Sequence, residues 1–133
     1  MNKTYSFEVA DAEKYGVDEA IVLYNLRFWL RKNLANDSNI HEGKIWTYNS
    51  FKAFAKLFPF WNTKKIERIL KKLKDAGAID VGCFNKLPYD RTKWYTVLED
   101  EFMVEGVDES EYTGVTEPSK EELEKMLLEF ASR

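Results

Sequence analysis

The fold is decided by residues 58–77, which have the sequence FPFWNTKKIERILKKLKDAG. Pro59 cannot continue a helix, so a helix that reaches this point must end before it. Asn62 or Thr63 can cap a new helix by accepting a backbone N–H group, and Gly77 is a typical helix stop. The stretch therefore predicts the end of one helix, a tight turn and a second helix.

The second helix has one apolar face and one basic face. Its apolar residues recur at the 3.6-residue period of a helix, and they are Ile66, Ile69, Leu70 and Leu73. At about 100° per residue, the cations Lys64, Arg68 and Lys71 fall opposite this stripe, flanked by Lys65 and Lys72. Such a helix suits the major groove of DNA, although a lysine face that only meets solvent is a common alternative.

A β-hairpin follows the basic helix. Residues 79–83 alternate between apolar and polar side chains, the period of a half-buried strand. This alternation places Cys83 on the inward side, as a small core residue. Residues 85–90 are rich in turn formers, and residues 92–98 are dense in β-branched and aromatic side chains, as in a returning strand. The tip and flank of the hairpin carry three more cations, Lys86, Arg91 and Lys93.

The segment before the basic helix completes the pattern. Residues 45–48 predict a short strand that joins the hairpin as a third strand, and Asn49 or Ser50 can cap a helix that ends at Leu57. The connection of about four residues to the next helix matches a helix-turn-helix. The order predicts an α+β, mainly α fold, namely a winged helix-turn-helix with a small antiparallel sheet as its wing.

The first long helix is apolar on nearly all sides. It is predicted to run from a cap at Asp18 to about Lys32, with only Arg27 and Arg31 marking a polar edge. A helix of this kind must be covered on most of its surface. The cover is either the amino-terminal arm, where residues 5–9 form a short strand or an extended segment, or a second subunit in a homodimer formed through the 18–32 helix.

Four segments resemble the winged-helix domains of phage and prophage replication proteins, which are related to the amino-terminal domains of DnaD-type primosome and replisome-organiser proteins. These segments are Tyr15–Ile21, Trp46–Asn49, Phe58–Trp61 and Asp90–Tyr95. The resemblance covers roughly residues 5 to 98. It implies binding of double-stranded DNA, a link to replication initiation, self-association through the amino-terminal region and a place in the cytoplasm of a bacterial host. Members of this family often carry a further domain downstream.

Charge is distributed unevenly along the chain. Residues 1–98 carry 17 Lys or Arg and 11 Asp or Glu, a net charge of +6, whereas residues 99–133 carry 3 and 12, a net charge of −9. A basic body with an acidic tail fits a DNA-binding module better than the total of −3 does. We therefore expect a winged-helix domain over 1–98, an acidic linker over 99–117 and an amphipathic helix over 118–133.

The predicted carboxyl-terminal helix has its own apolar stripe. Ser119 and Glu122 are spaced as a capping box. The stripe follows at positions i, i+3, i+4 and i+7, and consists of Leu123, Met126, Leu127 and Phe130. It either packs on the body of the protein or docks on a partner protein or a second subunit.

No motif in the sequence predicts an enzyme, a cofactor or a metal site. The phosphate-binding glycine loop, HExxH and GxSxG are all missing. One cysteine excludes an internal disulfide and fits a reducing cytosol, and a single histidine, His41, cannot build a zinc site with it. No apolar run is long enough to span a membrane. Aromatic side chains could stack on unpaired bases, but core packing is the simpler role for Trp46, Trp61, Trp94 and Tyr95.

Two functions from different classes fit these patterns. The first is a double-stranded DNA-binding protein whose contacts are Asn62, Thr63, Lys64, Lys65, Arg68, Lys71, Lys72, Lys86, Arg91 and Lys93. The second is a protein-interaction adaptor or inhibitor that uses the same fold as a dimer or scaffold module, since fold alone does not fix function.

Overall fold

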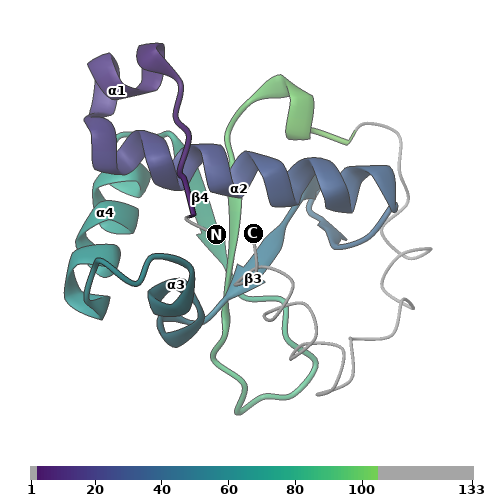
Figure 1. The fold of residues 1–133 in the computed structure, drawn as a ribbon. Helices are drawn as coiled ribbons and strands as arrows, with labels where there is room; N and C mark the ends of the chain where they lie inside the picture. The colour runs from purple at the N-terminus through teal and green to yellow at the C-terminus, as the bar shows by residue number, and fades with distance from the viewer. Residues whose placement is uncertain (1–2, 105–133) are drawn as a thin grey trace.

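The longest helix, α2 (Val17–Ala35), crosses the molecule, and the other elements are arranged around it (Figure 1). The computed structural model describes residues 3–104. The remaining helices are α1 (Val9–Tyr15), α3 (Phe51–Leu57) and α4 (Thr63–Asp75), and a short 3-10 turn, η1, covers Asp100–Phe102. In the described range the fold is α+β with four α-helices and small antiparallel sheets, which confirms the predicted class at this level.

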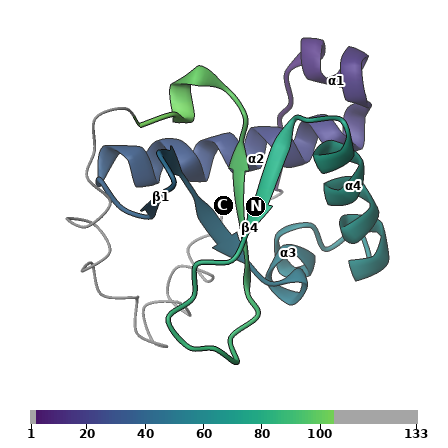
Figure 2. The ribbon, with the colours of Figure 1, turned by 180° about the vertical axis from the view of Figure 1, so that it is seen from behind.

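The strands form two antiparallel sheets. A two-stranded sheet joins β1 (Ile40–His41) to β2 (Lys44–Ile45). The larger sheet has the order β3-β5-β4, with β3 (Thr47–Asn49) and β4 (Ile79–Gly82) on either side of β5 (Lys93–Val97). The predicted hairpin and its third strand are thus present. Seen from behind, these strands lie in front of α2, which covers the other face of the sheet (Figure 2).

The turn between α3 and α4 is built as the sequence predicts. Ser50 caps α3, its hydroxyl accepting from the backbone N–H of Ala53 at 3.1 Å, and α3 ends at Leu57, ahead of Pro59. Of the two candidate caps for α4, Asn62 is the one used, and its Oδ1 accepts from the N–H of Lys65 at 2.8 Å. Fixing this turn fixes where α4 starts and which way it points.

Helix α4 ends in a Schellman motif. Gly77 has φ +75°, a conformation that residues with a side chain adopt only at a cost. Its N–H donates to the carbonyl of Lys74, and the N–H of Ala78 donates to the carbonyl of Leu73 at 2.9 Å. The helix stop therefore leads straight into β4.

One hydrophobic core lies between α2, α4 and the larger sheet. The predicted stripe on α4 is buried throughout, with Ile66 and Leu73 completely inaccessible. It belongs to the same cluster as Leu23, Leu26 and Leu30 of α2 and as Tyr95 and Val97 of β5. The predicted register of α4 is confirmed.

The amino-terminal segment is an arm, not a strand. Residues 3–8 have no regular structure. The hydroxyl of Tyr5 donates to the carbonyl of Leu57 at 2.5 Å. The centre of the Tyr5 ring lies 5.0 Å from the ring centre of Phe60 and 5.8 Å from that of Phe58. The arm thus crosses to the end of α3 and covers part of α2.

Three local expectations are wrong. Asp18 does not cap α2, because the cap position is occupied by Gly16, two residues earlier, whose φ is +111°, and Asp18 lies in the first turn of the helix. Arg27 is not at a polar edge, because only 6% of it is exposed. Cys83 is exposed and lies outside the core, because β4 ends at Gly82 and its alternation does not continue.

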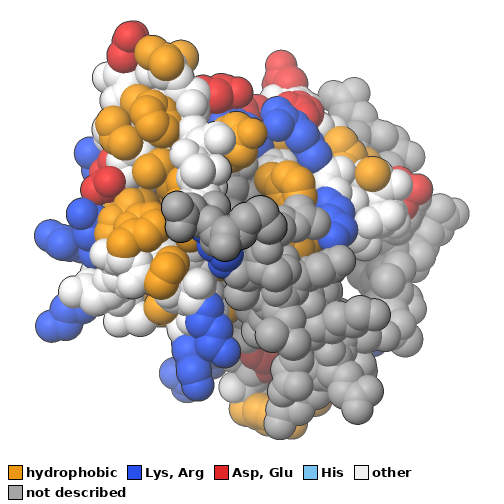
Figure 3. Space-filling model, in the orientation of Figure 1, with side chains coloured by type: hydrophobic (Ala, Val, Ile, Leu, Met, Phe, Trp, Pro, Cys, Tyr) orange, Lys and Arg blue, Asp and Glu red, His pale blue; other side chains and the backbone are white. Residues whose placement is uncertain are grey.

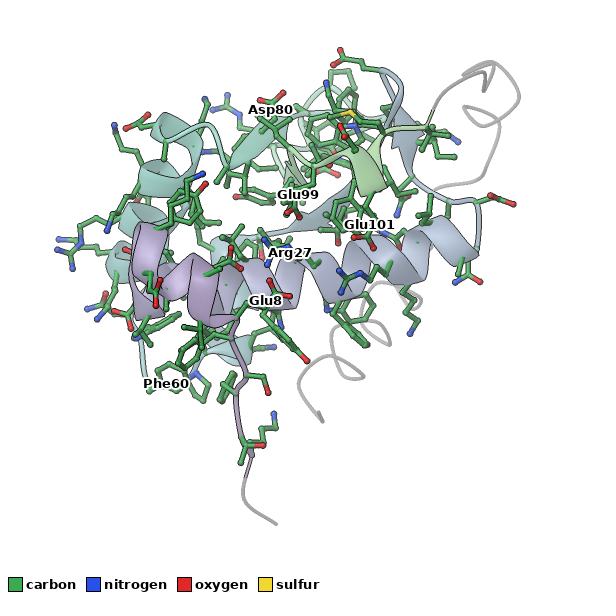
Figure 4. The ribbon with its side chains drawn as sticks, turned by 90° about the horizontal axis from the view of Figure 1, so that it is seen from above. Glu8, Arg27, Phe60, Asp80, Glu99 and Glu101 are labelled. Atoms are coloured by element: carbon green, nitrogen blue, oxygen red, sulfur yellow. The ribbon has the colours of Figure 1, made fainter. Side chains whose placement is uncertain are left out.

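The buried Arg27 joins three separate segments. Its Nη1 and Nη2 donate to the carboxylate of Asp11 in α1, the longer bond being 3.2 Å, and its Nε donates to Glu99 at 2.8 Å. Figure 4 shows Glu8, Arg27 and Glu99 close together across α2. Burial alone would lower the pKa of Arg27, but the hydrogen bonds to Asp11 and Glu99 outweigh it and raise the pKa.

The folded body extends beyond the predicted boundary at Leu98. Phe102 is fully buried, the N–H of Val104 donates to the carbonyl of Gly43 at 2.8 Å, and Arg31 bonds Glu101 at 2.6 Å. This bond lowers the pKa of Glu101. The predicted linker therefore starts no earlier than residue 105, and its remainder, 105–117, lies outside the described residues together with the predicted helix at 118–133. Within residues 3–104, no helix has the length and apolar character needed to cross a membrane.

Two arginines on the same helix allow a matched test of the buried cluster. Arg27→Met leaves the buried carboxylate of Asp11 without its cation, which should lower the free energy of unfolding by about 3–5 kcal/mol. Arg31→Met removes an exposed pair and should cost less than about 1 kcal/mol. Urea denaturation at neutral pH measures both, and equal losses for the two variants would show that the Arg27 cluster is solvated.

Candidate nucleic-acid interface

The outward face of α4 presents cations to solvent. Lys64 and Arg68 are exposed, and neither has an ion pair or hydrogen bond with any residue in the range 3–104. Thr63, the first residue of the helix, is exposed beside them. Figure 3 shows Lys and Arg side chains projecting from the side of the molecule where α3 and α4 lie. This face can meet a negatively charged partner without first breaking a contact.

Lys71 lies on the same face with a partner one turn away. Its Nζ bonds Oδ2 of Asp75 at 2.7 Å, and both side chains are largely exposed. The hydrogen bond raises the pKa of Lys71. Because exposed pairs of this type hold weakly and are screened by salt, Lys71 remains available to a phosphate.

Lys65 and Lys72 point toward the start of α2 instead. The ammonium of Lys65 lies 3.0 Å from Asp18 and 5.7 Å from the centre of the Trp61 ring. The ammonium of Lys72 donates to the carbonyl of Tyr15 at 2.7 Å and to Glu19 at 3.1 Å. Lys65 and Lys72 therefore also tie α4 to the start of α2, although both side chains remain partly exposed.

A hollow of about 190 Å³ lies between α3, α4 and the sheet. Three lysines line it, from two elements: Lys71 and Lys74 of α4, and Lys93 of β5, whose Nζ lies 5.2 Å from the centre of the Phe51 ring. The sequence prediction omitted Lys74, although its position three residues after Lys71 places it on the same helical face. The hollow therefore connects the basic face of α4 with the hairpin.

Two further groups in this hollow limit what it can accept. Glu67 lines it among the lysines, so its carboxylate disfavours a closely packed anion. Burial, and to a lesser extent Glu67, raises the pKa of Tyr95 to about 12. The phenol of Tyr95 is therefore neutral at physiological pH and adds no negative charge. The balance of charges around the hollow remains positive.

The hairpin loop is held by one side chain at its base. Asn85 donates through Nδ2 to the carbonyls of Asp90 and Thr92, at 2.9 and 2.8 Å, and accepts at Oδ1 from Nε1 of Trp94 at 2.7 Å. The carboxylate of Asp90 in turn accepts from the N–H of Thr92. This network fixes the loop that carries the exposed side chains of Lys86 and Arg91.

The aromatic side chains considered for base stacking pack against other residues of the protein. Trp46, Trp94 and Tyr95 are buried, so they cannot stack on bases without rearrangement, and Trp61 is half-buried beside Phe58 and Phe60. His41 stacks on Phe84 with ring centres 4.4 Å apart. In the described part of the chain, no cluster of His, Cys, Asp and Glu could hold a metal ion.

Comparison with known proteins gives no relative: no protein-family model matches the chain, and neither a curated protein nor a solved structure does.

The loop network gives a test of local order. Asn85→Ala removes four hydrogen bonds, one of them a weak bond to the sulfur of Cys83. It leaves the buried indole N–H of Trp94 unpaired, which should cost about 1–3 kcal/mol of stability. Amide exchange of Thr92 should accelerate while α4 keeps its protection. Leu87→Ala, an exposed change in the same loop, serves as the control, and equal behaviour of the two variants would show that Asn85 does not organise the loop.

Proposed function

We propose that this chain is a winged-helix protein that binds double-stranded DNA, with α4 as recognition helix and the loop between β4 and β5 as wing. The order α3, turn, α4, hairpin, with β3 as third strand, supports this assignment. The observation that carries it is the outward face of α4. There Lys64 and Arg68 project from a helix whose opposite side is fully buried, and neither is paired with a described residue.

The proposed contacts fall into three groups. Lys64 and Arg68 reach base edges and nearby phosphates in the major groove, where arginine pairs well with guanine. Asn62 and Thr63 lie where the positive end of the helix dipole meets a phosphate. The remaining cations contact the phosphate backbone of the DNA, and they are Lys71, Lys74, Lys86, Arg91 and Lys93. Lys65 and Lys72 act indirectly, by fixing α4 against α2.

The resemblance to phage and prophage replication proteins supports a role in replication initiation or its regulation, in the cytoplasm of a bacterial host. It also supports a homodimer formed through the 18–32 helix.

A second candidate is a protein-interaction adaptor or inhibitor. One observation favours it: α2 exposes large apolar side chains, with 44% of Tyr24 and 39% of Phe28 accessible. Exposed apolar patches that are contiguous mark interaction sites in many proteins. The two candidates use different faces, so a variant on one face leaves the other intact.

Fluorescence anisotropy with a random-sequence DNA duplex separates the candidates. The parent should bind at about 50 mM salt and weaken steeply as salt rises. Arg68→Ala should lose about 1–3 kcal/mol of binding free energy if it reads a base edge, and Lys64→Ala should lower the salt slope by about one if it contacts a phosphate. Neither change should alter the melting temperature, because both side chains are exposed.

Lys32→Ala is the matched control, because this lysine lies at the far end of α2 and packs its Nζ 4.9 Å from the Trp29 ring. It should bind DNA like the parent. Absence of binding by the parent at low salt, or the same loss in Lys32→Ala as in Arg68→Ala, would contradict the proposed interface and favour the adaptor.

A further inference from the structure

The loop between β4 and β5 ends in a turn that holds two apolar side chains in solvent. The backbone N–H of Asp90 donates to the carbonyl of Leu87 at 3.0 Å, which closes a four-residue turn. Pro88 takes the second position of this turn, where the fixed φ of proline is favourable. Leu87 is 47% exposed and Tyr89 is 78% exposed, the largest exposed fraction of any large hydrophobic side chain in residues 3–104.

The fold does not account for these exposed side chains. Neither Leu87 nor Tyr89 belongs to the hydrophobic core, and the Tyr89 side chain has no hydrogen bond or ring contact with any residue in the range 3–104. The other aromatic residues of the hairpin are packed, since Phe84 stacks on His41 and Trp94 is buried. A single exposed apolar residue is ordinary, but Leu87, Pro88 and Tyr89 together form an apolar tip that is available to a ligand.

The apolar tip is held in a fixed place by the residues at its base. Asn85 bonds the carbonyls of Asp90 and Thr92 across the loop. The hydroxyl of Thr92 donates to the carboxylate of Asp90 at 2.8 Å, so this negative charge is taken up within the loop. Figures 1 and 2 show the loop extending from the end of the sheet, away from α2. A preformed tip loses little conformational entropy when it binds.

Cations lie on both sides of the apolar tip. Lys86 precedes it, Arg91 follows it, and both side chains are exposed. Lys93, at the start of β5, lines the hollow that also contains Lys71 and Lys74 of α4. A polyanion bound along the outward face of α4 therefore meets further cations toward the hairpin, and the apolar tip lies beyond them.

We propose that Leu87 and Tyr89 enter the minor groove of the bound duplex and wedge into a base step, so that the wing bends the DNA; this rests on the DNA binding proposed above. The minor groove is about 6 Å wide, which admits a turn but not a helix. Apolar side chains inserted there partly unstack a base step and kink the duplex by about 20–90°. The ring of Tyr89 stacks on the exposed base, while Lys86 and Arg91 contact phosphates on the two sides of the groove.

Such a wedge selects DNA by its deformability. Pyrimidine–purine steps such as TA kink at low cost, whereas A-tracts are stiff. The side chain of Leu87 carries no hydrogen-bonding group, and that of Tyr89 carries one hydroxyl, so the apolar tip reads few base edges. Leu87 and Tyr89 therefore contribute to specificity through the shape of the DNA, whereas Lys64 and Arg68 contact base edges and phosphates in the major groove.

Energy transfer between dyes at the two ends of a short duplex with central TA steps measures the bend. At saturation the parent should raise the transfer efficiency, and the double variant Leu87→Ser/Tyr89→Ser should leave the duplex unbent. The double variant should bind about tenfold more weakly, because the cost of unstacking offsets part of the stacking gained. Its salt slope should equal that of the parent, because no charge is removed. Tyr89→Phe keeps the ring and should keep the bend.

Val9→Ser is the matched control. It also replaces an exposed apolar side chain, 66% of which is accessible. This residue is in α1, which lies at the opposite end of the molecule from the hairpin loop (Figure 1). The control should bind and bend the duplex as the parent does. Replacing the adenine of a central TA step with 2-aminopurine gives a second signal, because its fluorescence rises when the parent unstacks that base.

The outcomes separate this wedge from DNA binding itself. If the parent binds the duplex without changing the energy transfer or the 2-aminopurine fluorescence, the wedge is overturned and the proposed DNA binding stands. The same conclusion follows if the double variant bends the duplex as Val9→Ser does. An effect of the double variant on binding to single-stranded DNA alone would assign the apolar tip to unpaired bases and overturn the wedge. No binding of the duplex by the parent at low salt would overturn both proposals.

Discussion

Burial of the apolar stripe on α4 is the constraint on which the rest of the structure depends. Four aliphatic side chains, Ile66, Ile69, Leu70 and Leu73, lie between α2 and the sheet. Each contributes roughly 1.5–3 kcal/mol on burial, whereas exposed ion pairs contribute about 0–1 kcal/mol each. Packing therefore sets the rotation of α4, and the outward direction of Lys64 and Arg68 follows from it. The proposed interface is a consequence of the core.

Ion pairs refine this arrangement where segments distant in sequence meet. Arg27 holds α1 and the exit segment at Glu99 on the same side of α2. Lys65 and Lys72 hold α4 against the first turn of α2. These contacts leave the basic side of α4 and the hairpin on one surface, and the exposed apolar side chains Tyr24 and Phe28 of α2 on another.

The sequence predicts the elements that local patterns control. The caps at Ser50 and Asn62, the stripe of α4, the stop at Gly77 and the hairpin all depend on neighbouring residues, and all are present. Burial of Arg27 could not be predicted in this way, because one of its partners, Glu99, is 72 residues away. The same reason explains why the local pattern predicts a linker from residue 99 onward, although residues 99–104 pack on the body.

In the candidate site, too, local patterns predict the direction of a side chain, whereas contacts with distant segments are not predicted. A helical wheel gives the direction of each side chain but not its neighbours, so Lys65 and Lys72 could not be separated from Lys64 and Arg68 until α2 was in place. Lys74 was omitted, although its spacing from Lys71 was visible, because the hollow it lines requires β5 and α3 as further walls. Residues of one helix can be ranked as contacts only when the elements packed beside it are known.

The central claim is that the outward face of α4 is the surface that meets DNA. A titration of ¹⁵N-labelled protein with a short DNA duplex, followed by amide chemical shifts, tests it most directly. If α4 meets DNA, the largest changes fall on residues 62–74 and on the loop at 85–93, with residues 21–29 of α2 unaffected. Changes confined to residues 21–29, or no changes at low salt, would contradict it.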